Sequence, residues 1–169
     1  MKSRKDWGAR PAKNGGDRLR TPVPEVVIHH TDSFWRSLNL GGYNDEQEYI
    51  ARVKEIQDDH MDNEGFDDIG YNFLIDGYGN VYEGRGWDTK GAHVYKANSG
   101  KIGISFIGYF ENDLPTPAAL RAGRNLIACG EEKKKLRMFY TVSCHSDFGS
   151  AGGNTDCPGN ALCRYSKGN

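Results

Sequence analysis

The sequence Val-Val-Ile-His-His-Thr at residues 26–31 marks the centre of the expected fold. Its run of β-branched residues shows no alternation, which predicts a strand over residues 25–30 that is buried on both faces. The strand ends on His29 and His30, and ligand sites in open α/β sheets gather at the carboxyl ends of strands. Because side chains alternate along a strand, the two histidines must face opposite ways, and only one can reach a given site.

Two stretches carry the period of amphipathic helices. Apolar residues recur every three or four positions over residues 45–65, with Asp45 as a candidate N-cap and Gly65 as a stop. The same period returns over residues 116–130, where Pro117 takes the first helical position and a glycine follows the last apolar residue. Both helices are expected to flank the sheet.

Four further strands are expected at residues 71–76, 80–84, 101–110 and 138–143. Glycines between the first two predict a hairpin, and Gly103 and Gly108 in the third leave room for a neighbouring backbone or side chain. Strands and helices alternate, so the fold class is α/β: a single domain with a central mixed β-sheet flanked by helices. Residues 1–24 are expected to form an N-terminal arm packed on the body through Trp7, and residues 25–169 to form the domain itself.

Composition and charge narrow the classes of partner. The 169 residues carry 22 basic and 23 acidic side chains, and this net charge of -1 gives no sign of capture by nucleic acid or by an anionic membrane. No apolar run approaches the roughly 20 residues that a membrane span needs. The first residues lack the apolar core of a secretory signal, so the protein either acts inside a cell or is a form whose signal has been removed.

Residue types that bind metals gather in two places. His145 and Cys157 close a short polar loop near the C-terminus, and His29 ends the strand at residues 25–30. Imidazole and thiolate are preferred ligands of zinc, and three protein ligands with one open position are typical of a catalytic site. An open position can hold a water whose pKa the metal lowers to about 7. The spacing of His145 and Cys157 matches no zinc finger, however, and a strand-end histidine by itself also fits a structural hydrogen bond.

If Cys157 binds a metal, three other cysteines remain. Cys129 is interpreted as a small buried apolar group. Cys144 and Cys163 are candidates for a disulfide, which requires their Cα atoms to lie within about 7 Å, a distance that the sequence does not give.

Longer motifs run through nearly the whole chain. They are DWGARP (6–11), VVIHHT (26–31), IGYNFL (69–74), GNVYEGRGW (79–87), GAH (91–93), IGISFIG (102–108), LIACG (126–130) and CPGNAL (157–162). Together they resemble the peptidoglycan recognition protein family, whose fold is shared with bacteriophage amidases of the T7 lysozyme type. Several long matches in the same order are far more specific than any single motif.

The resemblance implies a zinc-dependent N-acetylmuramoyl-L-alanine amidase, which hydrolyses the amide between the lactyl group of N-acetylmuramic acid and L-alanine in bacterial peptidoglycan. One zinc ion per chain would be held by His29, His145 and Cys157, and Tyr71 and Thr155 would assist catalysis. Members that only bind peptidoglycan commonly lack the cysteine. The alternatives are a non-catalytic pattern-recognition receptor and a zinc ion that only stabilises the fold. Without the resemblance, Tyr71 fits a packed sheet tyrosine.

The resemblance also implies a set of residues lining a groove for peptidoglycan: His30, Thr31, His60, Tyr71, Arg85, His93 and Asn98. Arg85 would pair with the extra carboxylate of meso-diaminopimelic acid, since a guanidinium holds a carboxylate with two parallel bonds. The alternative for Arg85 is a solvated hairpin arginine. Gly65-Phe66 departs from the Gly-Trp pair common in members with this preference.

Other features depart from the family pattern. The segment 32–44 lacks the cysteines of a small disulfide loop, Cys144 and Ser146 flank His145 where glycine and arginine are usual, and no closing helical segment is expected before Asn169. By resemblance the protein binds muropeptides in innate immunity and is secreted, with a cytoplasmic location as the alternative. No feature of the sequence sets its oligomeric state.

Overall fold

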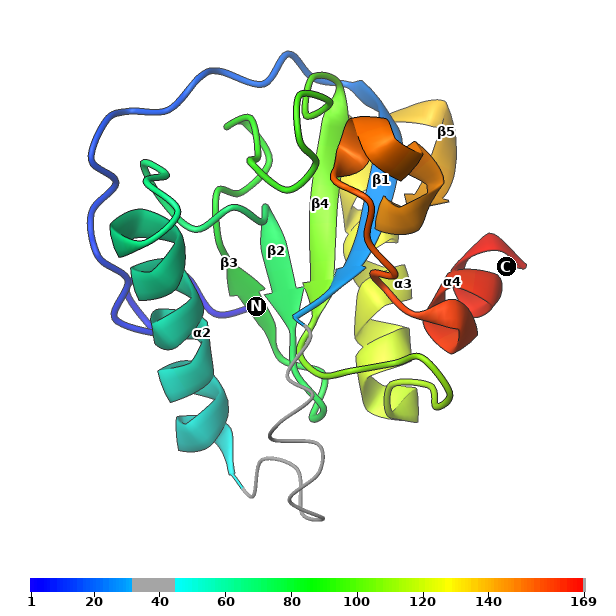
Figure 1. Cartoon of the computed structure of the whole chain (residues 1–169), viewed down its shortest axis with the longest axis horizontal. Coiled ribbons are helices and arrows are strands. Elements are labelled where there is room, and N and C mark those ends of the chain that lie inside the picture. Colours follow the sequence, from blue (N-terminus) through cyan, green and yellow to red (C-terminus); the bar gives the residue numbers. More distant parts are fainter. Residues whose placement is uncertain (32–44, 169) are drawn as a thin grey trace.

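A five-stranded sheet forms the centre of the computed structural model, which describes residues 1–31 and 45–168 (Figure 1). The strands are β1 (Val23–His30), β2 (Phe73–Ile75), β3 (Val81–Glu83), β4 (Lys101–Phe106) and β5 (Leu136–Cys144), in the order β3-β2-β4-β1-β5. β1 runs parallel to both of its neighbours, β4 and β5, and only β3 is antiparallel to its partner. The expected α/β fold with a mixed sheet is confirmed.

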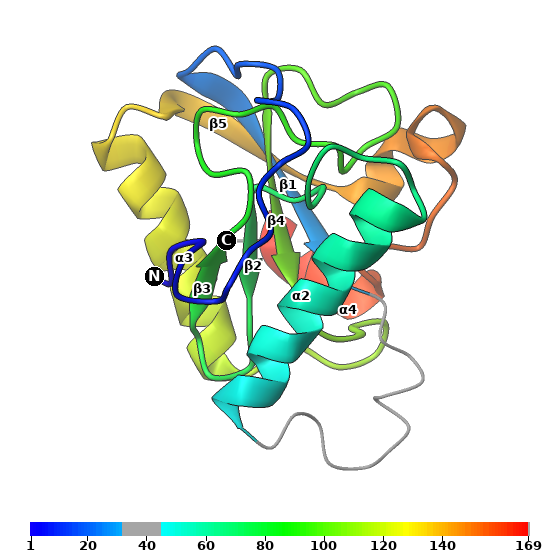
Figure 2. The same ribbon diagram turned by 90° about the vertical axis from the view of Figure 1, so that its left-hand side faces the viewer.

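Helices cover both faces of this sheet. α2 (Glu46–Asp62) packs on one face, and α3 (Pro117–Glu132) and α4 (Asn160–Lys167) pack on the other (Figure 2). The predicted helix starts are confirmed, because the Asp45 carboxylate accepts the Glu48 N–H at 3.0 Å and Pro117 opens α3. No helix among the described residues is long and apolar enough to cross a membrane.

Two expectations about helix ends were wrong. α3 continues beyond Gly130, because this glycine serves close packing: a Cβ there would lie 2.6 Å from the Trp87 ring. The chain also has a closing helix, α4, where none was expected from the sequence. α4 is short, but it buries Leu162 in the core and is tied to β5 by a disulfide between Cys144 and Cys163. Tertiary contacts therefore hold a helix that its own length would leave marginal.

The alternation of side chains along the strands divides the core into two. Ile28, Phe73 and Ile75 point toward α3 and α4, whereas Leu74 points toward α2. His29 follows Ile28 in β1 and therefore lies on the α2 side of the sheet. This parity decides on which face a site at the end of β1 can form.

The N-terminal residues are attached to the α2 side. Trp7 is buried and donates its indole N–H to the Glu83 carbonyl at 2.9 Å, which confirms its predicted role as an anchor. Lys2 adds a bridge beside Tyr82 in β3. The strand predicted over 25–30 begins two residues earlier, at Val23. The segment 32–44, which the sequence comparison marked as a departure, lies outside the described residues.

Candidate metal centre and active site

Three residues expected to bind a metal come together at the carboxyl end of the sheet. His29 ends β1, His145 begins the 3₁₀ segment η1 (His145–Gly152) directly after β5, and Cys157 lies in the loop before α4. One ligand atom from each residue lies within 4.8 Å of those of the other two. Parallel pairing of β1 with β5 aligns Ile28 with Cys144, which brings the residues that follow them to the same edge.

The donor set and its spacing fit zinc. The His29 Nδ1 and Cys157 Sγ atoms are 3.6 Å apart. Zinc–nitrogen bonds of 2.0–2.1 Å and a zinc–sulfur bond of 2.3 Å at tetrahedral angles would separate such atoms by about 3.6 Å. His29 and Cys157 are 1% and 7% exposed, whereas His145 is half-buried. The cluster is therefore closed toward the core and borders solvent at His145.

A hydrogen bond at the opposite ring nitrogen sets the tautomer of His145, and that of His29 is coupled to the tautomer of His93. The His145 Nε2 lies 3.0 Å from the Gly152 carbonyl, which can only accept, so Nε2 carries the proton and Nδ1 keeps a lone pair. The His29 Nε2 lies 2.9 Å from the His93 Nδ1. When His29 donates in this pair, its Nδ1 lone pair is directed to the side of Cys157. Such outer hydrogen bonds typically orient metal-binding histidines.

The electrostatics of the cluster favour neutral imidazoles. Burial, reinforced by the neighbouring His93 and His145, holds the pKa of His29 well below its usual value. Burial also lowers the pKa of His145 and brings that of His93 to about 3. Neutral imidazole is the form that binds metal, so these histidines are ready to act as ligands at neutral pH without losing a proton.

The two residues expected to assist catalysis lie beside the cluster. The Tyr71 ring centroid is 5.3 Å from that of His29 and 5.5 Å from that of His60 at the end of α2. The Thr155 hydroxyl accepts the Cys157 N–H at 3.1 Å. A phenol and a hydroxyl thus flank the three candidate ligands.

His93 occupies a place that the sequence did not foresee. It was expected only to line a groove, but it is 6% exposed and contacts His29 directly. Its ring fits against two glycines, because a Cβ on Gly91 or Gly103 would lie 2.3 or 2.4 Å from its Cδ2. The predicted room at Gly103 is therefore confirmed, and the neighbour that fills it is His93. Asn98 supports the same loop, since its Oδ1 accepts the N–H groups of His93 and Val94, both at 2.8 Å.

Other expected groove residues also have partners outside the cluster, although the His30 N–H donates to the Cys157 Sγ at 3.2 Å. His30 faces away from His29, as strand alternation requires, and its ring stacks on Tyr109 at a centroid distance of 5.4 Å. The Thr31 hydroxyl accepts the Gly108 N–H at 3.1 Å. His60 remains close to Tyr71, and its Nδ1 accepts the Gly70 N–H at 2.8 Å. Thr31 and His60 therefore also hold the main chain at Gly108 and Gly70 in place.

Arg85 contacts main-chain carbonyl groups. Its guanidinium donates to the carbonyls of Ile69, Lys90 and Asp68 at 2.7, 2.9 and 3.3 Å. These contacts join two loops beside the site, and they occupy three of the five N–H donors of the side chain. Burial lowers the pKa of Arg85, although an arginine remains charged at any physiological pH. The solvated hairpin arginine considered from sequence does not describe this half-buried group.

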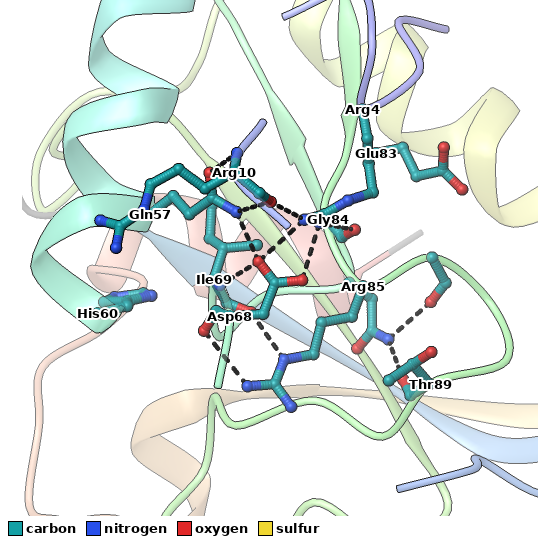
Figure 3. A network of polar contacts seen from close by, with 12 residues as sticks. Arg4, Arg10, Gln57, His60, Asp68, Ile69, Glu83, Gly84, Arg85 and Thr89 are labelled. Carbon is teal, nitrogen blue, oxygen red and sulfur yellow. Dashed lines mark hydrogen bonds and ion pairs between the residues drawn. The ribbon is translucent and has the colours of Figure 1, made fainter. Parts of the chain in front are cut away.

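The buried carboxylate of Asp68, which the sequence did not single out, lies in a network of polar contacts (Figure 3). Asp68 accepts the Gln57 Nε2 of α2 at 2.6 Å and the Ile69 N–H at 2.8 Å, and it forms an ion pair of 2.9 Å with Arg4. It therefore ties the N-terminal residues and α2 to the loop that leads to Tyr71. No local pattern marks such a residue, because two of its partners, Arg4 and Gln57, come from distant segments. The Gly152 carbonyl beside His145 was missed because no local pattern gives the path of the chain between them.

Comparisons with known proteins agree with this architecture. A family model described as N-acetylmuramoyl-L-alanine amidase matches residues 19–160. Peptidoglycan-recognition protein SC2 of Drosophila simulans is 39% identical over 157 residues, which cover 93% of this chain and 79% of that protein. An N-acetylmuramoyl-L-alanine amidase of Sus scrofa is 38% identical over 157 residues, which cover 92% of this chain and 25% of that protein.

A solved structure is similar over almost the whole chain. It is the peptidoglycan recognition protein-LE, known from Drosophila melanogaster, in complex with tracheal cytotoxin, a monomeric diaminopimelic acid-type peptidoglycan. The TM-score is 0.88 at 35% sequence identity, covering 98% of this chain and 91% of that one. Fold, sequence and the matched family model agree, and the chain therefore belongs to the peptidoglycan recognition protein family.

Proposed function

We propose that this protein is a zinc-dependent N-acetylmuramoyl-L-alanine amidase that hydrolyses the bond between the lactyl group of N-acetylmuramic acid and L-alanine. The observation that carries the proposal is the convergence of His29, His145 and Cys157, with a nitrogen–sulfur distance of 3.6 Å that suits one tetrahedral zinc ion per chain. Membership of the amidase family supports the same chemistry.

In this proposal the candidate ligands bind the metal, and their neighbours orient those ligands or assist hydrolysis. Zinc bound there would supply a Lewis acid that polarises the amide carbonyl and activates water near neutral pH. His93 and the Gly152 carbonyl hold His29 and His145 in the tautomer that leaves Nδ1 available. Tyr71 stabilises the oxyanion that develops on the carbonyl by donating its phenolic proton in a hydrogen bond. Thr155 adds a second polar group and keeps the loop of Cys157 in place through the Cys157 N–H.

We further propose that the substrate is bacterial peptidoglycan, with stem peptides that carry meso-diaminopimelic acid. The relative LE binds a peptidoglycan of this type. In this chain Arg85 uses three N–H donors on carbonyls, which leaves two for a carboxylate. Arg85 also borders a polar pocket of about 290 Å³ that Asp67 and Lys90 line. Binding and hydrolysis of peptidoglycan fit a role in innate immunity.

Secretion is part of the proposal. The disulfide between Cys144 and Cys163 supports it, since such bonds persist in oxidising compartments and are rare in the cytosol. Cys129 and Cys157 form no disulfide with each other.

The deciding experiment is hydrolysis of purified peptidoglycan by the zinc-loaded protein, with and without a chelator. Released stem peptide is measured by mass spectrometry, zinc content by metal analysis, and muropeptide binding by calorimetry. The amidase is expected to bind one zinc ion and to lose both metal and hydrolysis in Cys157→Ser, while muropeptide binding survives. Cys129→Ala is the matched control and should change none of the three.

Two other outcomes would replace the proposal. Muropeptide binding with no released peptide, at full zinc occupancy, would identify a recognition receptor. Loss of thermal stability on chelation, with no hydrolysis to lose, would mean that the metal only stabilises the fold.

A further inference from the structure

The edge strand β5 carries a large bulge. In its pairing with β1, Val23 aligns with Leu136 and Glu25 aligns with Thr141. The four residues 137–140 of β5 therefore stand opposite the single residue Pro24. Such an insertion cannot follow the ladder, so the chain bends outward at this point.

The bulge displays two large apolar side chains. Met138 and Phe139 are 81% and 88% exposed, the highest values among the large hydrophobic residues that the structure describes. A single exposed apolar side chain is ordinary on a protein surface. Two neighbouring residues of this kind in a bulge concentrate exposed apolar surface in one place, and such surface marks interaction sites.

Positive charge surrounds these two side chains. Lys133 and Lys134 lie in the turn just before β5, and Arg137 lies in the bulge itself. All three are exposed, and none forms an ion pair with another residue of the described chain, whereas the nearby Lys135 pairs with Asp88 at 2.6 Å. We name Lys133, Lys134, Arg137, Met138 and Phe139 the bulge patch.

The charged residues of the bulge patch are all positive, whereas the whole chain has a net charge of -1. Glu131 and Glu132 end α3 just before the bulge patch, and the total net charge is -1. The net charge therefore gave no sign of this surface. What distinguishes the bulge patch is that its three cations flank an exposed apolar pair without acidic partners among the described residues.

We propose that the bulge patch binds the surface of an anionic phospholipid bilayer. Lipid headgroups offer phosphates to Lys133, Lys134 and Arg137, and the acyl boundary beneath them takes up Met138 and Phe139. A bilayer surface therefore offers partners to both the cationic and the apolar side chains of the bulge patch. A soluble anionic polymer would leave the two apolar side chains in water.

A second copy of the chain fits less well. A twofold interface through β5 would bring the same lysines and arginine of two chains together, and these like charges repel. The bulge also interrupts the ladder that edge-to-edge strand pairing requires.

The bulge patch lies far from the candidate active site. Leu136 and Cys144 mark the two ends of β5, and His145 follows the second. At about 3.3 Å per residue, the strand places the bulge roughly 20 Å from His145. A bilayer bound at the bulge patch would therefore leave the zinc cluster and its neighbours open to a wall fragment, and the inference stands apart from the proposed amidase activity.

The test is sedimentation of the protein with vesicles of phosphatidylglycerol and phosphatidylcholine, compared with vesicles of phosphatidylcholine alone. Binding is expected only to the anionic vesicles and should weaken as salt is added. Met138→Ser/Phe139→Ser should weaken binding at least tenfold, since the buried apolar area is lost. Lys133→Ser/Lys134→Ser should weaken it about tenfold or more, at roughly fivefold for each lysine.

Matched controls separate the bulge patch from general effects. Leu114→Ser removes another exposed apolar side chain, and Lys5→Ser/Lys54→Ser removes two exposed lysines elsewhere. Both controls should bind vesicles within about twofold of the unchanged protein, because their residues lie outside the bulge patch. Hydrolysis of soluble muropeptide, if the amidase proposal holds, should be the same in all variants.

Insertion has a direct optical readout. In Phe139→Trp, the emission of the new indole should shift to the blue with anionic vesicles, because its surroundings become apolar. Equal binding by Met138→Ser/Phe139→Ser, no binding to anionic vesicles, or concentration-dependent dimers that this double variant abolishes would each overturn the proposal.

Discussion

At the scale of single residues, the candidate site depends on which nitrogen of each histidine is left for a metal. His145 is fixed by a main-chain carbonyl, whereas His29 is fixed by another titratable side chain, His93. The bond between His29 and His93 depends on the tautomer of His93, because a histidine can accept or donate at Nδ1. Burial keeps His93 neutral, with a pKa of about 3, so one of its two ring nitrogens is an acceptor, and His29 donates when that nitrogen is Nδ1.

Removing the His93 ring should weaken metal binding. We expect His93→Ala to lower zinc affinity about 10–100-fold, as is typical when an outer hydrogen-bond partner of a ligand is lost. Zinc affinity is measured by competition with a chelating dye. His93→Gln should recover part of the loss, since its amide oxygen can accept from the His29 Nε2.

If His93 only lined the groove and did not support His29, the result would differ. His93→Ala would then weaken muropeptide binding while zinc affinity stayed unchanged. His60→Ala serves as the comparison, because His60 lies near Tyr71 and contacts the Gly70 N–H.

Tyr71 gives a second prediction at this scale. Tyr71→Phe should keep its zinc and its fold but lose about 10²-fold or more in the rate constant for amide hydrolysis, because one transition-state hydrogen bond is removed. Single-turnover kinetics and metal analysis are the measurements. Tyr78→Phe, an exposed tyrosine, is the control. An unchanged rate constant at full zinc content would leave Tyr71 with a packing role only.

At the scale of elements, one covalent link encloses most of the candidate metal centre. The disulfide between Cys144 and Cys163 joins β5 to α4 across 19 residues. His145 and Cys157, two of the three candidate ligands, lie within that loop. The third, His29, comes from β1, whose pairing with β5 sets its distance from the loop.

Opening the loop should affect stability and metal binding together. Cys144→Ala/Cys163→Ala is expected to lower the free energy of unfolding by about 3 kcal/mol, from the chain entropy of a loop of this length. Zinc affinity should fall as well, since two ligands lose a constraint on their separation. Denaturant unfolding and chelator competition measure the two effects. Cys129→Ala, a free and half-buried cysteine, should change the zinc affinity little; an equal loss there would contradict the role of the bridge.

At the scale of the whole molecule, the histidines couple stability to pH. The folded-state pKa values of His29, His60, His93 and His145 all lie below the usual value, with burial as the first cause. The unfolded chain, in which they titrate near 6.5, therefore binds more protons than the folded chain at mildly acidic pH. Their contribution to stability is complete above about pH 6.5 and falls as the pH drops below it.

The size of this effect follows from two buried histidines whose pKa burial lowers, His29 and His93. Each of His29 and His93 should cost about 1.4 kcal/mol of unfolding free energy per pH unit below 6.5. Between pH 6.5 and 5 the metal-free protein should thus lose about 3–4 kcal/mol, measured by denaturant unfolding in the presence of a chelator. His93→Gln should reduce the slope by about half. A flat profile over this range would mean that these side chains are protonated in the folded state.

The sequence by itself determined the fold class, both main helices, the buried strand ending in two histidines and the identity of the three candidate ligands. Each of these depends on local period, helix capping or motifs that stand in the chain as written. Only the tertiary structure decided that Cys144 and Cys163 are bridged, that His93 contacts His29, that Asp68 joins three segments and that Met138 and Phe139 stand out on a bulge. These features depend on strand register and on contacts between residues far apart in the chain. No local pattern encodes a distance between such residues, because only the packed fold brings them together.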